Sequence, residues 1–384
     1  MTTSESNNSS DTADQRFMRR ALRLARLGFT APNPMVGCVL VRNGEIVGQG
    51  YHPRAGEPHA EIFALTDAGE RAQGATVYVT LEPCAHWGRT PPCTDALIAA
   101  GVRRVVAATK DANLSVPHGG MLKLAEAGIV TQLGVLEDAA SELNEAYFHY
   151  QLTGRPFVTL KWAMSLDGKS ATRTGSSQWI TSKRARKIVH EMRARSGAVL
   201  TGIGTLLADD AELTSRLEPA PPRQPLRVVL DSRLRTPPEC RAVRAIRPDT
   251  PLLIFASHDA PVGAEEALTR AGAQVTRVGR DAHGALDLSA VLADLGAREI
   301  VSLFVEGGGA INASFVERGE AQKALAFIAP LLIGGKDAST PVEGRGAGVI
   351  DEAVQLHRML VRRVGPDVLL EGYLQTTTQR DRRA

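Results

Sequence analysis

The first regular pattern of apolar positions along the chain has helical spacing. Phe17, Ala21 and Leu24 recur every three or four residues within 14–27, which predicts an amphipathic helix there. The preceding residues, 1–13, are rich in Ser, Asn and Thr and contain almost no apolar side chains. Because such a stretch has too little apolar surface to pack, we expect a disordered tail.

After this helix the pattern changes to an alternation of strands and helices. Two apolar stretches flank Asn43-Gly44, the strongest short signal for a β-hairpin. Runs rich in β-branched residues then predict strands over 75–84, 103–109 and 128–134. Segments with helical spacing predict helices that begin near residues 59, 93 and 119. This alternation indicates an α/β sandwich.

The pattern restarts after Gly154-Arg155-Pro156, which we interpret as a hinge. Further apolar strands are expected, with helices between them, at 157–168, 198–203, 225–232, 251–257, 300–308 and 323–334. A chain of 384 residues is also too long for one small core. We therefore predict two α/β domains, one over 14–153 and one over 156–375.

Composition and charge narrow the classes of protein that fit. Lys and Arg total 45 and Asp and Glu 42, a net charge of +3, whereas a nucleic-acid binder usually carries a concentrated basic face. No run approaches the ~18 consecutive apolar residues of a membrane helix, and the first residues lack the basic and apolar regions of a secretory signal. We expect a cytoplasmic protein with no nucleic-acid or membrane partner.

Three short motifs supply metal-binding side chains. His59-Ala60-Glu61 lies at an expected helix start, Cys84 follows a strand, and Cys93 lies at the next helix start. One imidazole and two thiolates can hold Zn²⁺ and leave its fourth position to water, whose pKa the metal lowers toward about 7. Glu61 is close enough to carry the proton of that water. The sequence predicts a catalytic site with one zinc per chain.

Two other interpretations of these residues are open. A structural zinc site would have four protein ligands, and no fourth Cys or His stands at the spacing of a zinc finger. The cysteines could also be unconnected buried residues, which is how we interpret Cys38 and Cys240. With four cysteines and no export signal, a disulfide framework is not expected.

The motif H-x-E with a later P-C resembles the cytidine-deaminase-like superfamily, whose zinc motif is completed by P-C-x-x-C. Here eight residues separate the cysteines, and PCAHWGRTPPC is similar to the riboflavin-pathway deaminase, as are PNPMVGCVLV (32–41) and GYHPRAGEPHAE (50–61). This resemblance implies that Asn33 contacts the pyrimidine and that three other residues hold the substrate, namely His52, His86 and Arg89. The segment 111–120 departs from the usual D-P-N-P and is expected in the substrate wall.

Three consecutive glycines in the second domain, Gly307 to Gly309, separate a predicted strand from a predicted helix. Such a junction offers backbone amides and a helix amino terminus to a phosphate, although glycines serve tight turns equally well. The fingerprint G-x-G-x-x-G is absent from the sequence of this domain, so an ordinary Rossmann domain is not supported.

Five segments of the second domain resemble the reductase half of the bifunctional riboflavin biosynthesis enzyme, which has a dihydrofolate-reductase-like α/β fold. They are KWAMSLDGK, SSQWITS, TLLADDAELTSR, VVLDSRLR and FVEGGGAINASF. The resemblance assigns NADPH to Ser177, Trp179, Thr205, Asp209, Ser232, Gly307, Gly308, Gly309, Ala310, Ile311 and Asn312. It assigns the substrate to Lys161, Arg193, Leu213, Arg216 and Glu306. Ala211 and Ser215 replace a more common Pro and Val, so a looser turn is expected before Arg216.

Together the resemblances imply two reactions on one small molecule. Zinc-dependent hydrolysis would replace the C2 amino group of 2,5-diamino-6-ribosylamino-4(3H)-pyrimidinone 5′-phosphate by oxygen and release ammonia. Hydride transfer from NADPH to C1′ would then give 5-amino-6-ribitylaminouracil 5′-phosphate, with Asp209 or Glu306 as candidate acid. A homo-oligomer is expected. The alternatives are a nucleoside or guanine deaminase fused to an unrelated nucleotide-binding domain, and a regulatory protein with structural zinc.

The end of the strand expected over 225–232 bears on the choice of cofactor. Ser232 and Arg233 emerge at its carboxyl end, where α/β sheets bind ligands, and they suit the 2′-phosphate of NADPH. Asp231 would favour NADH if it faced the ribose. Because neighbours on a strand point to opposite faces, we expect Asp231 to point elsewhere.

Overall fold

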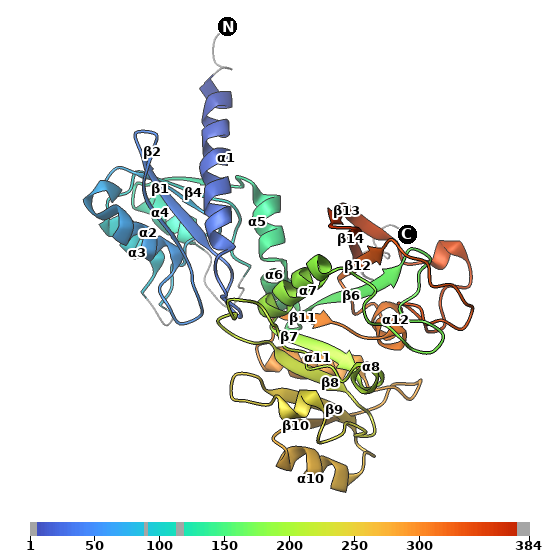
Figure 1. Ribbon diagram of the computed structural model, residues 1–384. Helices are drawn as coiled ribbons and strands as arrows, with labels where there is room; N and C mark the ends of the chain where they lie inside the picture. The colour runs from blue at the N-terminus through green and yellow to red at the C-terminus, as the bar shows by residue number, and fades with distance from the viewer. Residues whose placement is uncertain (1–5, 88–90, 113–118, 375–384) are drawn as a thin grey trace. The chain divides into compact units, whose positions relative to one another are not determined.

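The computed structural model describes residues 6–87, 91–112 and 119–374. The chain divides into two compact units, Met1–Gly154 and Arg155–Ala384, and each unit has its own sheet (Figure 1). Within the described residues, no helix combines the length and the apolar character that crossing a membrane would require.

The first unit is built on a five-stranded sheet in the order β2-β1-β3-β4-β5. β1 (Gly37–Arg42) pairs antiparallel with β2 (Glu45–Tyr51) and with β3 (Thr76–Val79), and β4 (Arg104–Ala107) and β5 (Val130–Leu133) continue in parallel. The predicted hairpin is confirmed. Asn43 and Gly44 have φ values of 53° and 81°, and a type I′ turn requires positive φ at both positions.

Helices cover both faces of this sheet and confirm the predicted sandwich. On one face α1 (Ser6–Ala25) buries Phe17 against Tyr78, and on the other face Leu97 of α3 (Cys93–Ala99) packs in a cluster with Val77. Tyr78 and Val77 belong to different clusters because successive strand residues point to opposite faces. The other helical segments are α2 (Ala60–Ala68), η1 (Gly69–Ala72), α4 (Gly120–Glu126), α5 (Glu137–Leu143) and α6 (Glu145–Thr153).

The first helix is longer than the sequence predicted. It begins at Ser6 rather than at residue 14, so the expected disordered tail is wrong over residues 6–13. Our prediction used apolar spacing, which these residues lack. Once the packed turns after residue 14 have nucleated a helix, however, each added residue costs little, because nucleation is the unfavourable step.

The second unit is built on a nine-stranded sheet in the order β10-β9-β8-β7-β11-β6-β12-β14-β13. The first seven strands in this order are parallel, and β14 and β13 are antiparallel. In chain order the strands are β6 (Phe157–Ser165), β7 (Ala198–Gly202), β8 (Leu226–Leu230), β9 (Leu252–Ser257), β10 (Gln274–Val278), β11 (Ser302–Val305), β12 (Lys323–Ala329), β13 (Leu356–Val364) and β14 (Asp367–Leu374). The seven parallel strands all end at the same edge of the sheet.

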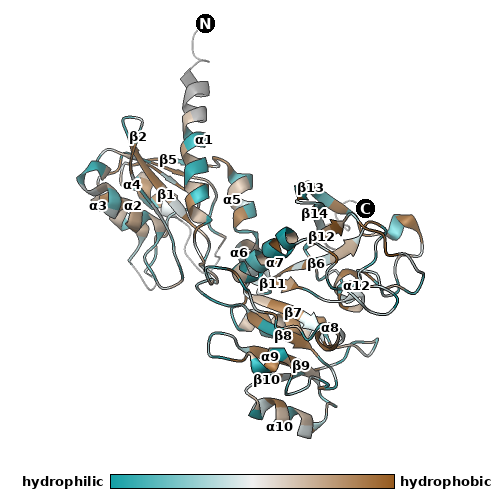
Figure 2. Ribbon diagram, viewed as in Figure 1, coloured by the Kyte–Doolittle hydropathy of each residue, from teal (hydrophilic) through white to brown (hydrophobic). Residues whose placement is uncertain are grey.

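Each face of this sheet carries a separate hydrophobic cluster. Val199 and Val229 belong to one cluster, and their strand neighbours Leu200 and Val228 belong to the other. Figure 2 shows these strands as hydrophobic and the outer helix α7 as largely hydrophilic. The helical segments are α7 (Lys183–Arg195), α8 (Ile203–Asp209), α9 (Arg241–Arg244), α10 (Val262–Arg270), α11 (Leu288–Ala297), α12 (Gly309–Glu317) and η2 (Ile350–Glu352).

Candidate active sites

His59, Cys84 and Cys93 meet where two helices of the first unit begin. His59 is the N-cap residue of α2, and Cys93 is the first residue of α3. Cys84 lies on the loop that follows β3. The metal-binding atoms of the three side chains all lie within 4.8 Å of one another. The sequence prediction that these residues form one cluster is confirmed.

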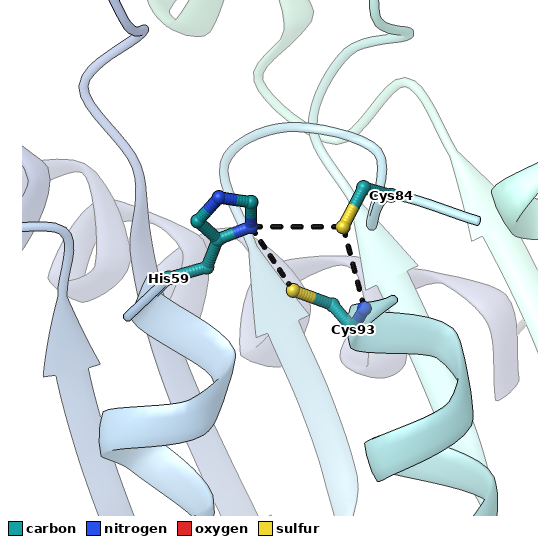
Figure 3. A group of neighbouring side chains, drawn as sticks. All are labelled: His59, Cys84 and Cys93. Atoms are coloured by element: carbon teal, nitrogen blue, oxygen red, sulfur yellow. Dashed lines mark hydrogen bonds between the residues drawn. The ribbon is translucent and has the colours of Figure 1, made fainter. Parts of the chain in front are cut away.

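The atoms that face one another are Nδ1 of His59 and the two sulfurs (Figure 3). Nδ1 lies 3.2 Å from Cys93 Sγ and 3.6 Å from Cys84 Sγ. Zinc bonds of about 2.05 Å to nitrogen and about 2.3 Å to sulfur at a tetrahedral angle place these atoms roughly 3.6 Å apart. The cluster therefore fits zinc, with His59 binding through Nδ1. Cys38 and Cys240 lie outside it and are buried, as predicted.

The surroundings of Cys84 favour its thiolate. The Cys93 thiol, the His59 imidazole and the backbone N–H of Cys93, which lies 3.3 Å from Cys84 Sγ, lower the pKa of Cys84 to about 4 against the effect of burial. The contact with Cys84, together with burial, raises the pKa of Cys93. The two sulfurs thus hold one proton between them when no metal is bound. Such a pair suits a dication, because zinc binds thiolates and displaces thiol protons.

Among the buried polar atoms that lack a hydrogen-bond partner in the described residues, two belong to residues that the sequence placed in the deaminase site. They are Oε2 of Glu61, a side chain that is 3% exposed, and Nδ1 of His86. Burial raises the pKa of Glu61, and the charge of His59 opposes this effect. Because native structures seldom leave buried polar atoms unpaired, both atoms fit a site that a bound water or substrate completes.

His52 and Asn33 form a hydrogen-bonded pair beside the cluster. The His52 ring is 2% exposed and meets the His59 ring edge-on, with centroids 5.5 Å apart. Its Nδ1 lies 3.0 Å from the Pro58 carbonyl oxygen, and its Nε2 lies 3.2 Å from Asn33 Nδ2. A carbonyl only accepts, so Nδ1 carries the proton and Nε2 accepts from the Asn33 amide. Both ring nitrogens of His52 are therefore used within the protein. His52 orients the Asn33 amide rather than binding the substrate through a free nitrogen.

Asn144 holds the loop of Asn33 from another side, and no sequence signal pointed to it. Its Oδ1 accepts from the backbone N–H of Met35 at 2.8 Å, and its Nδ2 donates to the Met35 carbonyl at 2.9 Å. These residues are 109 positions apart in the chain. Arg89 and residues 113–118 of the expected substrate wall lie outside the described residues.

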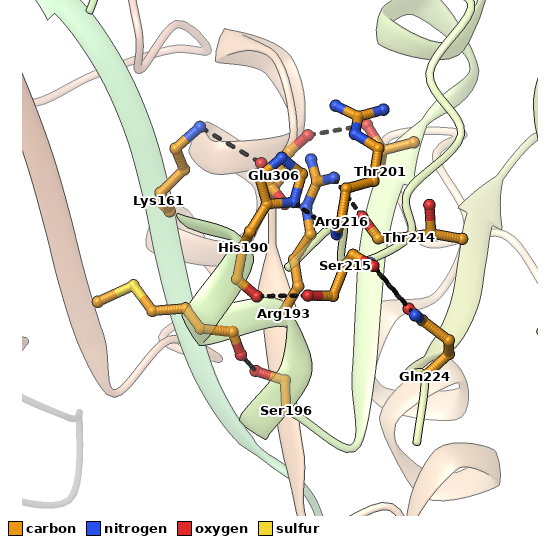
Figure 4. Close-up of polar contacts among 11 residues, drawn as sticks. Lys161, His190, Arg193, Ser196, Thr201, Thr214, Ser215, Arg216, Gln224 and Glu306 are labelled. Atoms are coloured by element: carbon orange, nitrogen blue, oxygen red, sulfur yellow. Dashed lines mark hydrogen bonds and ion pairs between the residues drawn. The ribbon is translucent and has the colours of Figure 1, made fainter. Parts of the chain in front are cut away.

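A second polar cluster lies in the second unit, where Glu306 directly follows β11. Its carboxylate is paired with Lys161 Nζ at 3.3 Å and with the Arg193 guanidinium (Figure 4). Burial raises the pKa of Glu306, but the charges of Arg193 and Lys161 outweigh burial and hold it at about 2. Glu306 is therefore ionised at neutral pH, and its two partners leave a net positive charge.

Arg216 joins this cluster through His190, which sequence reasoning missed. His190 Nδ1 accepts from the backbone N–H of Arg216 at 3.2 Å. Burial and the charges of Arg193 and Arg216 lower the pKa of His190 to about 4, so the ring is neutral and free to accept. A signal was present: His190 precedes Arg193 by three residues, and such pairs lie on the same face of a helix.

The glycine triplet forms a close-fitting turn before α12. Gly308 is the N-cap residue, so the N-cap position offers no side chain to the first N–H groups of the helix. A Cβ at Gly309 would lie 2.6 Å from the Thr340 carbonyl oxygen, and one at Gly307 would lie 2.5 Å from the Ile311 side chain. Larger residues are therefore excluded at both positions. The backbone and the uncapped helix amino terminus fit a phosphate group.

Other residues expected at the nucleotide lie at the same edge of the sheet. Ser177 donates a hydrogen bond to Asp209 at 3.1 Å. A Cβ at Gly308 would lie 3.3 Å from Thr205 Oγ1, so the hydroxyl is next to the turn. Trp179 is 63% exposed, and the Arg186 guanidinium stacks 4.2 Å from its ring centroid.

The structure places two expected contact residues in the interior. Leu213 is 2% exposed and packs in a hydrophobic cluster, so its side chain is not available to a substrate. Asn312 is 0% exposed, and its Nδ2 donates to the Pro341 carbonyl at 2.8 Å. A motif match identifies positions but not side-chain directions, which depend on packing. The Asn312 side chain instead supports the loop that contains Pro341, beneath the glycine turn.

The turn before Arg216 is not loose, which corrects our expectation for Ala211 and Ser215. Ser215 is 4% exposed, and its hydroxyl and backbone make hydrogen bonds to His190 and Gln224. Ala211 packs against a hydrophobic cluster. Polar partners thus replace the rigidity that proline would have supplied.

Asp231 points into the interior, as predicted from strand alternation. It is 0% exposed, and its Oδ2 accepts from the backbone N–H of Thr236 at 2.7 Å and from the Thr236 hydroxyl at 2.8 Å. Ser232 is half-buried and Arg233 is exposed. The two residues after Asp231 are therefore left to face a ligand.

Two protein families match the chain. The cytidine and deoxycytidylate deaminase zinc-binding region matches residues 11–109, and the RibD C-terminal domain matches residues 156–370. The riboflavin biosynthesis protein RibD of Aquifex aeolicus is 43% identical over 359 residues, which cover 93% of this chain and 97% of that protein. RibD of Escherichia coli is 43% identical over 370 residues, which cover 93% and 98%.

Solved structures are similar over the same length. RibD from Acinetobacter baumannii superposes with a TM-score of 0.84 at 37% identity, covering 95% of this chain and 100% of that one. A Thermotoga maritima protein, described as a diaminohydroxyphosphoribosylaminopyrimidine deaminase and 5-amino-6-(5-phosphoribosylamino)uracil reductase, superposes with a TM-score of 0.83 at 34% identity and the same coverage. Both similarities span both units.

We predict that Cys84→Ser abolishes zinc binding, because a serine hydroxyl is a poor substitute for a thiolate ligand. The measurement is metal content by elemental analysis after purification in zinc-containing buffer. Cys240→Ser is the matched control, since Cys240 is a buried cysteine of the second unit, outside the cluster, and should retain one zinc per chain. Full zinc occupancy in Cys84→Ser would contradict the site.

Proposed function

Since the chain belongs to the RibD family of bifunctional riboflavin biosynthesis enzymes, we propose that residues 14–153 form its zinc-dependent deaminase domain and residues 156–375 its NADPH-dependent reductase domain. Deaminase and reductase relatives match along nearly the whole chain, which excludes a deaminase fused to an unrelated domain. The observation that carries the proposal is the presence of two separate polar sites, one around His59 and one around Glu306.

We propose that the first reaction is hydrolysis of 2,5-diamino-6-ribosylamino-4(3H)-pyrimidinone 5′-phosphate. Water adds to C2, the bond from C2 to the amino group breaks, and ammonia leaves. The second reaction reduces the product: a hydride reaches C1′ of the ribosyl group and a proton reaches the ring oxygen, which opens the sugar to ribityl. Ammonia release and loss of NADPH absorbance on this substrate are the direct test of both activities.

In the deaminase site each residue has a distinct task. Bound zinc would lower the pKa of a water molecule to about 7. Glu61, with Oε2 unpaired beside the ligands, would take a proton from that water and give it to the leaving amine. Asn33, oriented by His52, would hold the pyrimidine edge. His86 offers a second unpaired buried atom to the substrate.

In the reductase site we propose that Glu306 is not the acid. Two cations keep its carboxylate ionised, so it has no proton to give at neutral pH. Its task is to fix Lys161 and Arg193, whose charges suit an anionic substrate. Of the two candidate acids this leaves Asp209, which is half-buried and accepts a hydrogen bond from Ser177.

NADPH would supply the hydride, and the chain supplies its binding surface. We propose that the amides of Gly307 to Ala310 and the start of α12 hold its pyrophosphate, with Thr205 beside the turn. Trp179 presents an exposed aromatic face at the same edge. We also propose a cytoplasmic location, because unpaired thiol ligands persist in a reducing compartment.

Glu61→Gln should keep zinc but lower the deamination rate by about a hundredfold or more, because glutamine cannot transfer the proton. Ammonia release from the diaminopyrimidine phosphate measures this. Glu70→Gln, at an exposed position just after α2, should leave the rate unchanged. Retention of more than about a tenth of the wild-type rate in Glu61→Gln would argue against the proton-transfer role.

For cofactor choice, we expect the wild type to prefer NADPH over NADH, because Ser232 and Arg233 can bind the 2′-phosphate while Asp231 is turned away. Ser232→Ala/Arg233→Ala should lose most of this preference. The measurement is reductase kcat/KM with each cofactor, and the deamination rate of the same variant is the control. If the double variant keeps its preference for NADPH, Ser232 and Arg233 do not bind the 2′-phosphate.

We further propose that the enzyme is a homo-oligomer in which β13 meets a second copy. β13 is an edge strand; eight of its nine residues are exposed, among them Leu360 and Val361. An exposed edge strand offers unpaired backbone groups to another chain, and β13 presents apolar residues between its basic ones. Light scattering should give a multiple of 41.0 kDa, and Leu360→Glu/Val361→Lys should lower it. A monomeric wild type would refute the proposal.

A further inference from the structure

The segment 210–216 brings Arg216 to the reductase site through an unfavourable backbone conformation. Asp210 and Leu213 have φ values of 43° and 63°, in the left-handed region that residues with a Cβ seldom adopt. Such conformations persist only where the surroundings fix them. Thr214 and Ser215 are 5% and 4% exposed, whereas Arg216 is exposed. The chain is thus anchored immediately before the charged side chain.

The side-chain amide of Gln224 makes two hydrogen bonds to the backbone of Ser215, one through its oxygen and one through its nitrogen. Its Oε1 accepts from the N–H of Ser215 at 2.8 Å, and its Nε2 donates to the carbonyl of Ser215 at 3.0 Å. That carbonyl belongs to the same planar peptide unit as the N–H of Arg216. Gln224 therefore fixes one end of the peptide unit that carries Arg216.

His190 fixes the other end of this peptide unit (Figure 4). The N–H of Arg216 donates to His190 Nδ1 at 3.2 Å, and the hydroxyl of Ser215 donates to the His190 carbonyl at 2.8 Å. Because a peptide unit is planar, holding its C=O and its N–H fixes the position of the Arg216 Cα, from which the side chain extends. Gln224 is not part of the helix that carries His190, so the unit is held from two elements.

Such a restraint has an electrostatic reason. Arg216 lies close enough to Arg193 for the charge of Arg193, after burial, to lower the pKa of Arg216, and Glu212 and Glu306 oppose this effect. Two guanidinium groups repel each other, and Glu306 is already paired with Arg193. A fixed backbone limits how far this repulsion can move Arg216 from Arg193. A rigid peptide keeps the second cation in place for an anionic substrate.

We propose that Gln224 is a positioning residue of the reductase: it presents Arg216 beside Arg193 by fixing the Ser215–Arg216 peptide unit. The inference rests on the proposed function, in which Arg216 contacts the substrate. It assigns Gln224 no contact with substrate or cofactor. Its effect should therefore pass through Arg216 and vanish when Arg216 is removed.

The test is a double-mutant cycle on the full chain with Gln224→Leu and Arg216→Ala. Gln224→Leu should raise the KM for the ribosylaminouracil phosphate by about tenfold, since two hydrogen bonds are lost, and leave the KM for NADPH unchanged. In the Arg216→Ala background the same substitution should change the substrate KM by less than about twofold. Gln224→Met, a flexible side chain of similar size, replaces Gln224→Leu if that variant does not fold.

Gln322→Leu is the matched control. Gln322 also holds a backbone group, with Oε1 accepting from Val158 N–H at 2.7 Å, but at the beginning of β6 and away from the site. It should lower the melting temperature without moving the substrate KM. If the fold-increases in substrate KM from Gln224→Leu and Arg216→Ala multiply in the double variant, Gln224 acts independently of Arg216. Gln224 is then merely structural and the proposal is overturned.

The same cycle is run on the affinity for ribose 5-phosphate by calorimetry, which needs no turnover. A wild type that binds ribose 5-phosphate but reduces no ribosylaminouracil phosphate would refute the proposed function, and the cycle on affinity would still decide the role of Gln224. If Gln224→Leu weakens ribose 5-phosphate binding only when Arg216 is present, the positioning role is supported. If the two losses of affinity multiply, the role is overturned.

Discussion

Both sites lie where strands that run in the same direction leave their sheet and the chain turns into a helix at one edge. At this edge backbone N–H groups lack strand partners and helix amino termini point outward. In the first unit the junctions deliver His59 and Cys93 at the starts of α2 and α3. In the second, Glu306 and the glycine turn lie between β11 and α12. In the second unit this junction is short, whereas in the first unit the loop between β3 and α3 also carries Cys84.

Two buried glutamates show how the surroundings, rather than the residue type, decide chemistry. Glu61 has one oxygen without a partner, and burial raises its pKa. Glu306 is also buried, but Lys161 and Arg193 hold its pKa at about 2. The first carboxylate is suited to accept a proton and the second is not. The same type of side chain is therefore suited to proton transfer in one unit and is paired with two cations in the other.

The sequence predicted what depends on short-range patterns. Spacing identified the cluster of His59, Cys84 and Cys93 and the Asn43-Gly44 turn. It could not predict contacts that arise when distant segments pack, such as Asn144 with Met35 across 109 positions or Gln224 with Ser215. It also missed the burial of Leu213 and Asn312, because side-chain direction depends on packing and on the left-handed φ of 63° at Leu213.

The strand order of the larger sheet has a consequence for synthesis on the ribosome. β6 is the first strand of the second unit to be made, yet its partners β11 and β12 come last among the parallel strands; Phe157 pairs with Ser302 and Thr159 with Lys323. At about 5–20 residues per second, the apolar β6 waits roughly 7 to 30 seconds for its neighbours. In the first unit β1 meets β3 after a far shorter stretch, since Cys38 pairs with Val79. The nascent chain therefore completes the zinc-binding sheet early and leaves β6 exposed, a natural target for chaperones until residue 329 has emerged.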